Sequence, residues 1–155
     1  MFRPEASNEE IEQDVEDVII ELVTELDDLA HADPVPEGAD DRAYVKAFSD
    51  VHANSDRDQV SLLVNAVLRP HLAEALILLN QRMDREDLDP GCPAGIIGVI
   101  VRLAMDGLWV SDIMDPTRFT DEQRQRLTGI LTDLTHLPDE RLERLLDEVV
   151  PPSEA

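Results

Sequence analysis

Hydrophobic residues recur along this chain at intervals of three and four, the spacing of one face of an amphipathic helix. The first such pattern follows Ser7 and Glu10, which have the spacing of a capping box. It comprises Ile11, Val15, Val18, Ile19, Leu22, Val23, Leu26 and Leu29. Two prolines and a glycine within residues 33–38 cannot continue it. The sequence therefore predicts a long helix with one apolar stripe, followed by a loop.

Three shorter patterns lie between residues 40 and 87. Asp40 or Asp41 can cap the first of these helices. Its apolar face carries Tyr44, Ala47, Phe48 and Val51. Ser55 can cap the second helix, and Pro70 must end or bend it, because the residue before a proline disfavours the helical conformation. The third helix runs from Pro70 into the charged residues 84–87.

The most apolar stretch follows Pro93, a residue type suited to the first turn of a helix. Apolar residues occupy nearly every side of a helix over residues 94–114. The uninterrupted apolar run ends at Val101, before Arg102 and Asp106, well short of the roughly 18 residues that a membrane span needs. We therefore predict a central soluble helix that is covered on all sides.

Two more helices are expected after this one. Thr120 and Gln123 form another capping-box pattern, which starts a helix over residues 120–135. Its apolar positions are Leu127, Ile130, Leu131 and Leu134. A short terminal helix over residues 142–149 stops before two prolines. Because neither strand-like alternation nor a fixed repeat occurs, the predicted fold class is all-α, a bundle of about seven helices.

The length and net charge of the chain limit the number of domains and the kinds of partner that we expect. Its 155 residues are enough for a single core. We expect one domain over residues 1–137 and a short terminal helix with a frayed tail over residues 138–155. The net charge is −22, and residues 1–33 hold twelve acids and one arginine. A protein with this net charge repels nucleic-acid phosphates and anionic lipids. The acidic first helix is then either a solvated face or a docking surface for a basic partner.

Candidate chemistry is sparse. The only cysteine, Cys92, excludes an internal disulfide, and at a helix N-terminus we expect it to be a buried capping thiol. The four histidines are scattered, so we expect no metal site and no cofactor. Without a nucleophile–base pair we expect no enzyme. The first residues lack the apolar core of a signal peptide, and we expect a cytoplasmic protein without a membrane segment.

Several features occur together over about residues 8–135. They are the long first helix, the break at Arg69-Pro70, the turn Asp87-Leu-Asp-Pro-Gly, the phrase Arg102-Leu-Ala-Met-Asp-Gly-Leu-Trp-Val-Ser-Asp-Ile, and the closing helix at residues 120–135. In this order they resemble the C-terminal regulatory domain of the TetR family of transcriptional regulators. The Asp-Gly-Leu-Trp helix is the distinctive part, and the remainder of the resemblance is helix order and length.

The resemblance implies a homodimer, because the last two helices of the family's domain form a four-helix bundle between two subunits. The implied interface lies on residues 94–114 and 120–135, with Leu127, Ile130, Leu131 and Leu134 in contact. Family members also carry an N-terminal helix-turn-helix, of which residues 2–7 could hold only the trailing edge. We therefore expect that the chain lacks this domain and does not bind DNA alone, since it has no basic cluster.

The resemblance also implies an apolar ligand pocket enclosed by the earlier helices. The candidate lining residues are Tyr44, Phe48, Leu76, Met83, Arg102 and Met105. Aromatic and methionine side chains would select ligand shape, and Arg102 would bind a carboxylate at one end of a small, mostly apolar effector. The residues alone leave a second possibility open, an ion pair between Arg102 and Asp106 at i, i+4.

We interpret the chain as the effector-binding and dimerisation domain of a TetR-like regulator. Ligand binding would shift its helices and, in a complete protein, the spacing of two DNA-reading heads. The alternative is a stand-alone acidic helical module that binds proteins and has no ligand. A sizeable closed cavity favours the first interpretation, and a solid core with an exposed apolar groove favours the second.

Overall fold

The computed structural model describes residues 8–54 and 56–149. Over these residues the chain forms eight α-helices and two short 3₁₀ helices, with no strand. In chain order they are α1 (Asn8–His31), α2 (Ala39–Ala47), α3 (Val51–Asn54), α4 (Arg57–Leu68), η1 (Pro70–Ala73), α5 (Glu74–Asp87), η2 (Pro93–Gly95), α6 (Ile96–Met114), α7 (Asp121–Thr135) and α8 (Asp139–Val149). The predicted all-α fold class is confirmed. None of these helices is long and apolar enough to cross a membrane.

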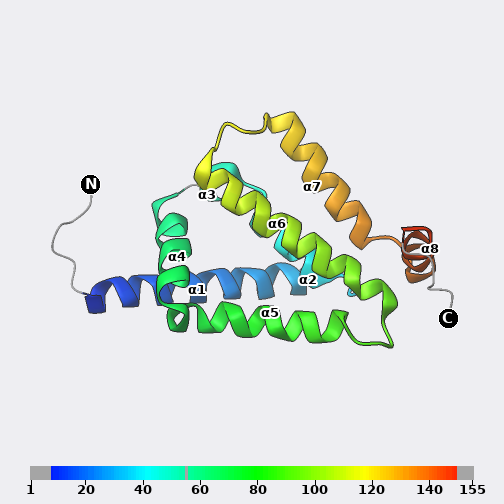
Figure 1. Cartoon of the computed structure of the whole chain (residues 1–155), viewed down its shortest axis with the longest axis horizontal. Coiled ribbons are helices and arrows are strands. Elements are labelled where there is room, and N and C mark those ends of the chain that lie inside the picture. Colours follow the sequence, from blue (N-terminus) through cyan, green and yellow to red (C-terminus); the bar gives the residue numbers. More distant parts are fainter. Residues whose placement is uncertain (1–7, 55, 150–155) are drawn as a thin grey trace.

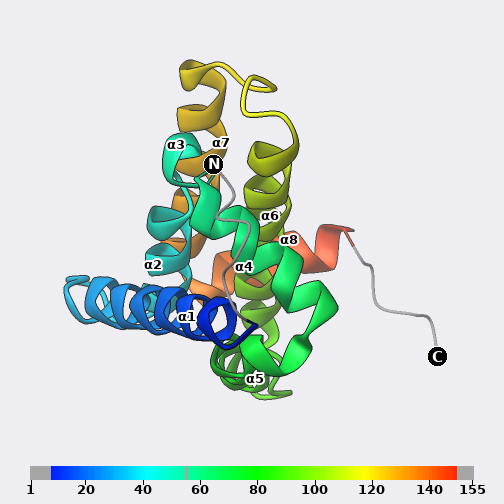
Figure 2. The same cartoon turned by 90° about the vertical axis from the view of Figure 1, so that its left-hand side faces the viewer.

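Helix α2 lies at the centre of the arrangement. It packs against α1 on one side and against α6 and α7 on the other. Figure 1 shows α1 and α5 side by side along one edge, with α6 crossing above them and α7 beyond α6. Figure 2 shows that α4 lies across α1 and that α8 extends out from the body. Helices α1, α6 and α7 therefore pack around α2 in a bundle that leaves outer faces of α6, α7 and α8 open.

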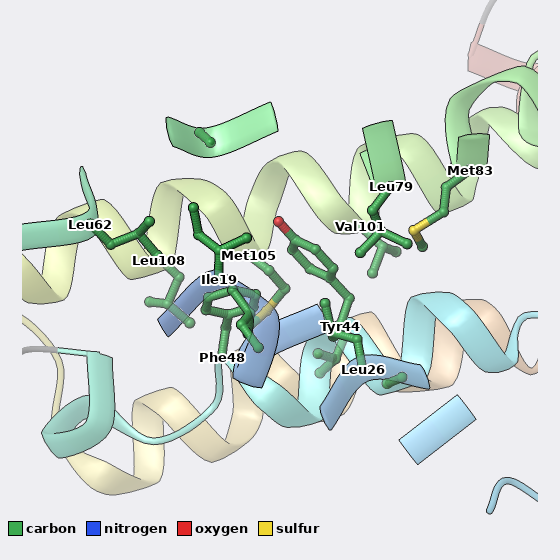
Figure 3. Packing of buried hydrophobic residues seen from close by; sticks show 14 of the residues in the cluster. Ile19, Leu26, Tyr44, Phe48, Leu62, Leu79, Met83, Val101, Met105 and Leu108 are labelled. Atoms are coloured by element: carbon green, nitrogen blue, oxygen red, sulfur yellow. The ribbon is translucent and has the colours of Figure 1, made fainter. Parts of the chain in front are cut away.

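The hydrophobic core fills the space where α1, α2, α5 and α6 meet (Figure 3). Its larger members include Ile19, Leu22, Leu26, Tyr44, Phe48, Leu79, Met83, Val101, Met105 and Leu108. The rings of Tyr44 and Phe48 have centroids 4.8 Å apart, and Phe48 lies 5.8 Å from the ring of Trp109. These tilted contacts are the favoured geometry for aromatic pairs. The stripe predicted on the first helix is the face that α1 buries, through Ile19 and its neighbours.

Within its own chain, helix α6 is only half covered, so the cover predicted on all sides is not completed by the described residues. Val101 and Met105 are completely buried. On the opposite side Ile100 is 48% exposed, Leu103 is 63% exposed and Met114 is 80% exposed. Because no other element of the described chain packs on that side, α6 carries an apolar stripe that faces outward.

The predicted helix starts were partly correct. Thr120 caps α7 by accepting the N–H of Gln123, while the Gln123 side chain accepts the N–H of Thr120, as predicted. The capping role of Asp40 or Asp41 was wrong, because α2 begins at Ala39 after Gly38. Gly38 adopts the left-handed conformation with a φ of 72°, which a residue without Cβ accepts at little cost. The predicted caps Ser7 and Ser55 lie outside the described residues.

Two further local predictions can be compared with the structure. The break at Pro70 is confirmed, since α4 ends at Leu68 and a short turn leads into α5. The pattern at residues 40–51 forms two helices instead of one, because Asp50 accepts the N–H of His52 and starts α3. Cys92 is exposed, not buried; it is the N-cap residue of η2, and its side chain makes no capping hydrogen bond.

Candidate functional site

An ionic cluster around the buried Arg102 joins α2, α5 and α6. The guanidinium of Arg102 on α6 donates to Asp41 on α2 at 2.5 Å. It also donates to Asp84 at 2.7 Å and to Asp87 at 2.6 Å, both on α5. The side chain of Arg102 is only 5% exposed. A buried guanidinium needs such partners because burial removes its hydrogen bonds to water. Arg102 therefore holds three helices together.

Asp106 does not pair with Arg102, so the predicted i, i+4 ion pair was wrong. Asp106 instead accepts the hydroxyl of Tyr44 at 2.5 Å. Three carboxylates from two other helices satisfy more of the guanidinium N–H groups than one carboxylate on the same helix could. Gly98 makes room for this arrangement, since a Cβ there would stand 2.4 Å from a carboxylate oxygen of Asp41.

The cluster holds more negative than positive charge, with four carboxylates around one guanidinium. Burial raises the pKa of Asp41 to about 6, with the repulsion of Asp87 adding to this shift and the attraction of Arg102 opposing it. Burial also raises the pKa of Asp106, although the hydrogen bond from Tyr44 opposes the shift. Burial and the adjacent Asp106 raise the pKa of Tyr44, so its hydroxyl remains a donor. A cation would be stabilised here, and a further anion would be repelled.

A second buried network fixes the start of α7. Asp112 on α6 is 1% exposed and accepts a charged hydrogen bond from Arg124 on α7. Asp112 also accepts the amide of Asn54 on α3 at 2.8 Å. Arg124 donates as well to the backbone oxygen of Ser49 at 3.2 Å. These bonds hold α3, α6 and α7 in one fixed arrangement.

The other end of α7 is held by Arg42, a buried residue of α2. Its guanidinium pairs with Asp33 at 2.8 Å and donates to the backbone oxygen of Thr135 at 3.2 Å. It also donates to the backbone oxygens of Val35 and Glu37 in the loop before α2. The hydrogen bond from Arg42 lowers the pKa of Asp33 to about 2. Both ends of α7 are thus tied to the body by buried arginines.

The residues predicted to line a ligand pocket lie in the core. Four of them, Tyr44, Phe48, Met83 and Met105, are buried, and Leu76 is partly buried against the same core. Tyr44 and Met83 border, with Leu79, a cavity of about 10 Å³. That volume is about the least that can hold one water molecule. An effector at this place would require α2 and α5 to move apart, and binding there stays a prediction.

A larger hollow of about 460 Å³ lies elsewhere, on the outer side of α1. It is bordered by Ile20, Glu21, Thr24, Glu25, Asp28 and Leu29, all from that one helix. A single convex helix cannot enclose a ligand, so we regard this hollow as open surface between long acidic side chains. It includes none of the predicted pocket residues.

The residues predicted for a dimer interface differ in exposure. On α7, Leu127 is 40% exposed and Ile130 is 51% exposed. Leu131 and Leu134 are partly buried and pack against the core of their own chain. The exposed apolar side chains therefore include Leu127 and Ile130 on α7 and those on the outward side of α6, a helix that the sequence analysis placed in the interface as the range 94–114 without naming single residues.

Sequence reasoning missed most of the buried charges. Arg102 alone carried a signal, because an arginine in an apolar helix must find carboxylates. Asp84 and Asp87 have a helical i, i+3 spacing that could have marked them as its partners. Nothing local distinguishes Arg124 from Arg126, since both stand in a polar run, and only the structure shows that one of them is buried.

A comparison with known protein families matches residues 40–136 to the family described as "Tetracyclin repressor-like, C-terminal domain". The chain belongs to this family. It is thus a TetR-type regulatory domain, and the resemblance drawn from the Asp-Gly-Leu-Trp helix is confirmed. The matched part begins in α2 and ends just after α7, so that α1 and α8 lie outside it. No curated protein and no solved structure gave a significant match.

Regulatory domains of this family are generally not enzymes. Over residues 8–54 and 56–149, no three or more His, Cys, Asp or Glu side chains are grouped so that they could hold a metal ion.

Proposed function

We propose that the outward face of α6 and α7 joins two copies of this chain into a homodimer, as the dimerising part of a TetR-type regulator. One observation carries the proposal: α6 and α7 present neighbouring apolar stripes that their own chain leaves open. Leu103 on α6 is 63% exposed and Ile130 on α7 is 51% exposed. A soluble monomer rarely exposes a continuous apolar patch, and such patches mark sites of association.

The position of α7 supports this proposal. Arg124 and Arg42 attach its two ends to the body through buried hydrogen bonds. These bonds hold α7 in one orientation, in which Leu127 is 40% exposed and Ile130 is 51% exposed. A stripe that is held outward in this way is pre-organised for a partner, so little conformational entropy is lost on association.

Gly107 lies within the exposed stripe of α6, and no atom stands within 4 Å of where its Cβ would be. A glycine inside a helix costs about 1 kcal/mol relative to alanine. Nothing in a single chain explains that cost at this position. The close approach of a second helix in a dimer would explain it, because backbones pack most closely where one of them has no side chain.

Sedimentation equilibrium of the purified chain at micromolar concentration tests the proposal, and about twice the chain mass is expected. Burial of a whole leucine contributes about 1.5–3 kcal/mol. Two symmetry-related copies of Leu103, each about two-thirds exposed, would then contribute about 2–4 kcal/mol to association. We expect Leu103→Glu to raise the dissociation constant by at least about 30-fold. Val67→Glu on α4, at a position 71% exposed, is the matched control. A monomeric wild type, or equal effects of both variants, would contradict the proposal.

A second candidate function is the sensing of a small, mostly apolar effector at the junction of α2, α5 and α6. The observation that favours it is the polar cluster of Tyr44, Arg102 and their four aspartates at the edge of the apolar core, in which Arg102 and Asp41 are buried while Asp84 and Asp87 are partly exposed. Because three carboxylates already bond to Arg102, the carboxylate ligand expected from the sequence would be repelled there. An effector with a cationic end would instead be stabilised by the excess of aspartates.

Thermal shift measurements with matched apolar amines and apolar acids test this second function. Amines are expected to raise the melting temperature, and acids of the same size are not. Asp106→Asn should reduce the response to amines. Asp133→Asn, at an exposed position on α7, should leave it unchanged. A response to acids alone, or to neither class, would remove this function and leave the dimer proposal standing.

A further inference from the structure

Helix α8 carries an apolar stripe that its own chain covers only at one end. Leu142, Leu145, Leu146 and Val149 recur at i, i+3, i+4 and i+7, and the other seven residues of the helix are charged. Leu142 is 7% exposed and Leu146 is partly buried, whereas Leu145 is 38% exposed and Val149 is 78% exposed. The outer half of the stripe is therefore open to solvent, although the helix has the pattern of one that packs along its whole length.

The position of α8 brings this open stripe next to the outward face of α6. Its inner end packs against η2, the turn that leads into α6. From there α8 extends beyond the body: in Figure 2, α2 lies to the left of α6, and α8 reaches to the right past α6. Helical spacing places Leu103 on the side of α6 opposite the buried Met105. Thus α8 projects beside the surface on which we have placed a second copy.

We propose that α8 is an arm whose outer apolar stripe packs onto the second copy of this chain. The inference rests on the proposed dimer, and it adds an element that lies outside the matched family region. Two-fold symmetry makes the contact reciprocal, so each copy both extends an arm and receives one. The inner end of the arm, held by Leu142, stays with its own chain.

The extent of the interface supports a second copy as the occupant. A stable interface takes about 20–30 residues from each side. Helices α6 and α7 contain 19 and 15 residues, and much of each faces its own chain, so their outward faces alone fall short of that number. The 11 residues of α8 are continuous with this face and would extend it.

The charge of α8 does not fit a membrane as the occupant. Amphipathic helices that bind anionic lipids carry lysine and arginine on the polar face. Here that face has five acids, Asp139, Glu140, Glu143, Asp147 and Glu148, and only two arginines, Arg141 and Arg144. The acids exceed the arginines, so phospholipid headgroups of negative charge would repel the helix.

The first test compares serine variants of the full chain by sedimentation equilibrium. Leu145→Ser with Val149→Ser should raise the dimer dissociation constant by about tenfold or more. Val67→Ser with Leu68→Ser, on α4 where both side chains are more than 70% exposed, should change it by less than about twofold. If Leu103→Glu breaks the dimer but the α8 variant associates like wild type, the arm is refuted and the dimer stands. A monomeric wild type would refute both.

The second test locates the arm. Val149→Cys in a Cys92→Ser background provides a single site for a spin label on α8. Mixed dimers of this labelled chain with an unlabelled ¹⁵N chain should show broadened amide signals in the ¹⁵N copy near its α6. Broadening that appears only within the labelled copy would mean that α8 folds back onto its own chain, and would overturn the proposal.

Discussion

Replacing Asp41 by asparagine tests whether the buried cluster has an excess of negative charge. The folded chain holds the pKa of Asp41 at about 6, against 3.8 for an unperturbed aspartate. Between these pH values the folded state binds more protons than the unfolded state, so stability must rise as the pH falls from 7 towards 4. A difference of about two pKa units corresponds to at most about 3 kcal/mol from this one group. Asp33, whose pKa is lowered to about 2, loses its contribution only below pH 3.8 and leaves this window unaffected.

Urea unfolding at a fixed protein concentration measures this effect. Trp109 is the only tryptophan and packs against Phe48, so its fluorescence reports on the core. Wild type should gain stability between pH 7 and 4.5, and Asp41→Asn should lose much of that gain, while Asp106, whose pKa burial also raises, supplies the remainder. Asp133→Asn, at an exposed position on α7, should keep the gain. If wild type loses stability over this range, or if Asp41→Asn keeps the full slope, the assigned burial and charge of Asp41 are wrong.

Three further outcomes follow from the structure. Arg124→Met should destabilise the fold by about 3–5 kcal/mol in urea unfolding, because it leaves Asp112 buried without its cation. Arg126→Met, at an exposed site, should change stability by less than about 0.5 kcal/mol. Gly98→Ala should lower the free energy of unfolding by about 1–3 kcal/mol, since its Cβ would meet two carboxylates. Gly129→Ala, with open space around it, should be neutral or stabilising, and equal effects of the two variants would contradict the packing. The melting temperature should rise from low to moderate salt, because ions screen the repulsion within a chain of net charge −22, and a falling curve would show that paired charges dominate.

Local sequence signals predicted the helices because the causes of helix formation are themselves local. The apolar spacing of α1 sets which face it buries, and Thr120 caps α7 through residues only three positions away. The break at Pro70 follows from the geometry of that residue and its neighbour. These features can be predicted without knowing which helices pack against each other. The family resemblance was also found from local sequence features, since it rests on the order of the helices and on one short phrase.

The tertiary structure alone decided which charges meet. Asp106 is four residues from Arg102, yet the guanidinium bonds to Asp41, Asp84 and Asp87, which are 61, 18 and 15 residues away. Arg102 points into the junction of three helices, where several carboxylates together compensate for the loss of water better than one could. Only the tertiary structure, likewise, shows that the core around Tyr44 is closed and that one side of α6 and of α8 is open. Periodicity marks a face as apolar, but only the arrangement of the helices determines whether another part of the same chain covers it.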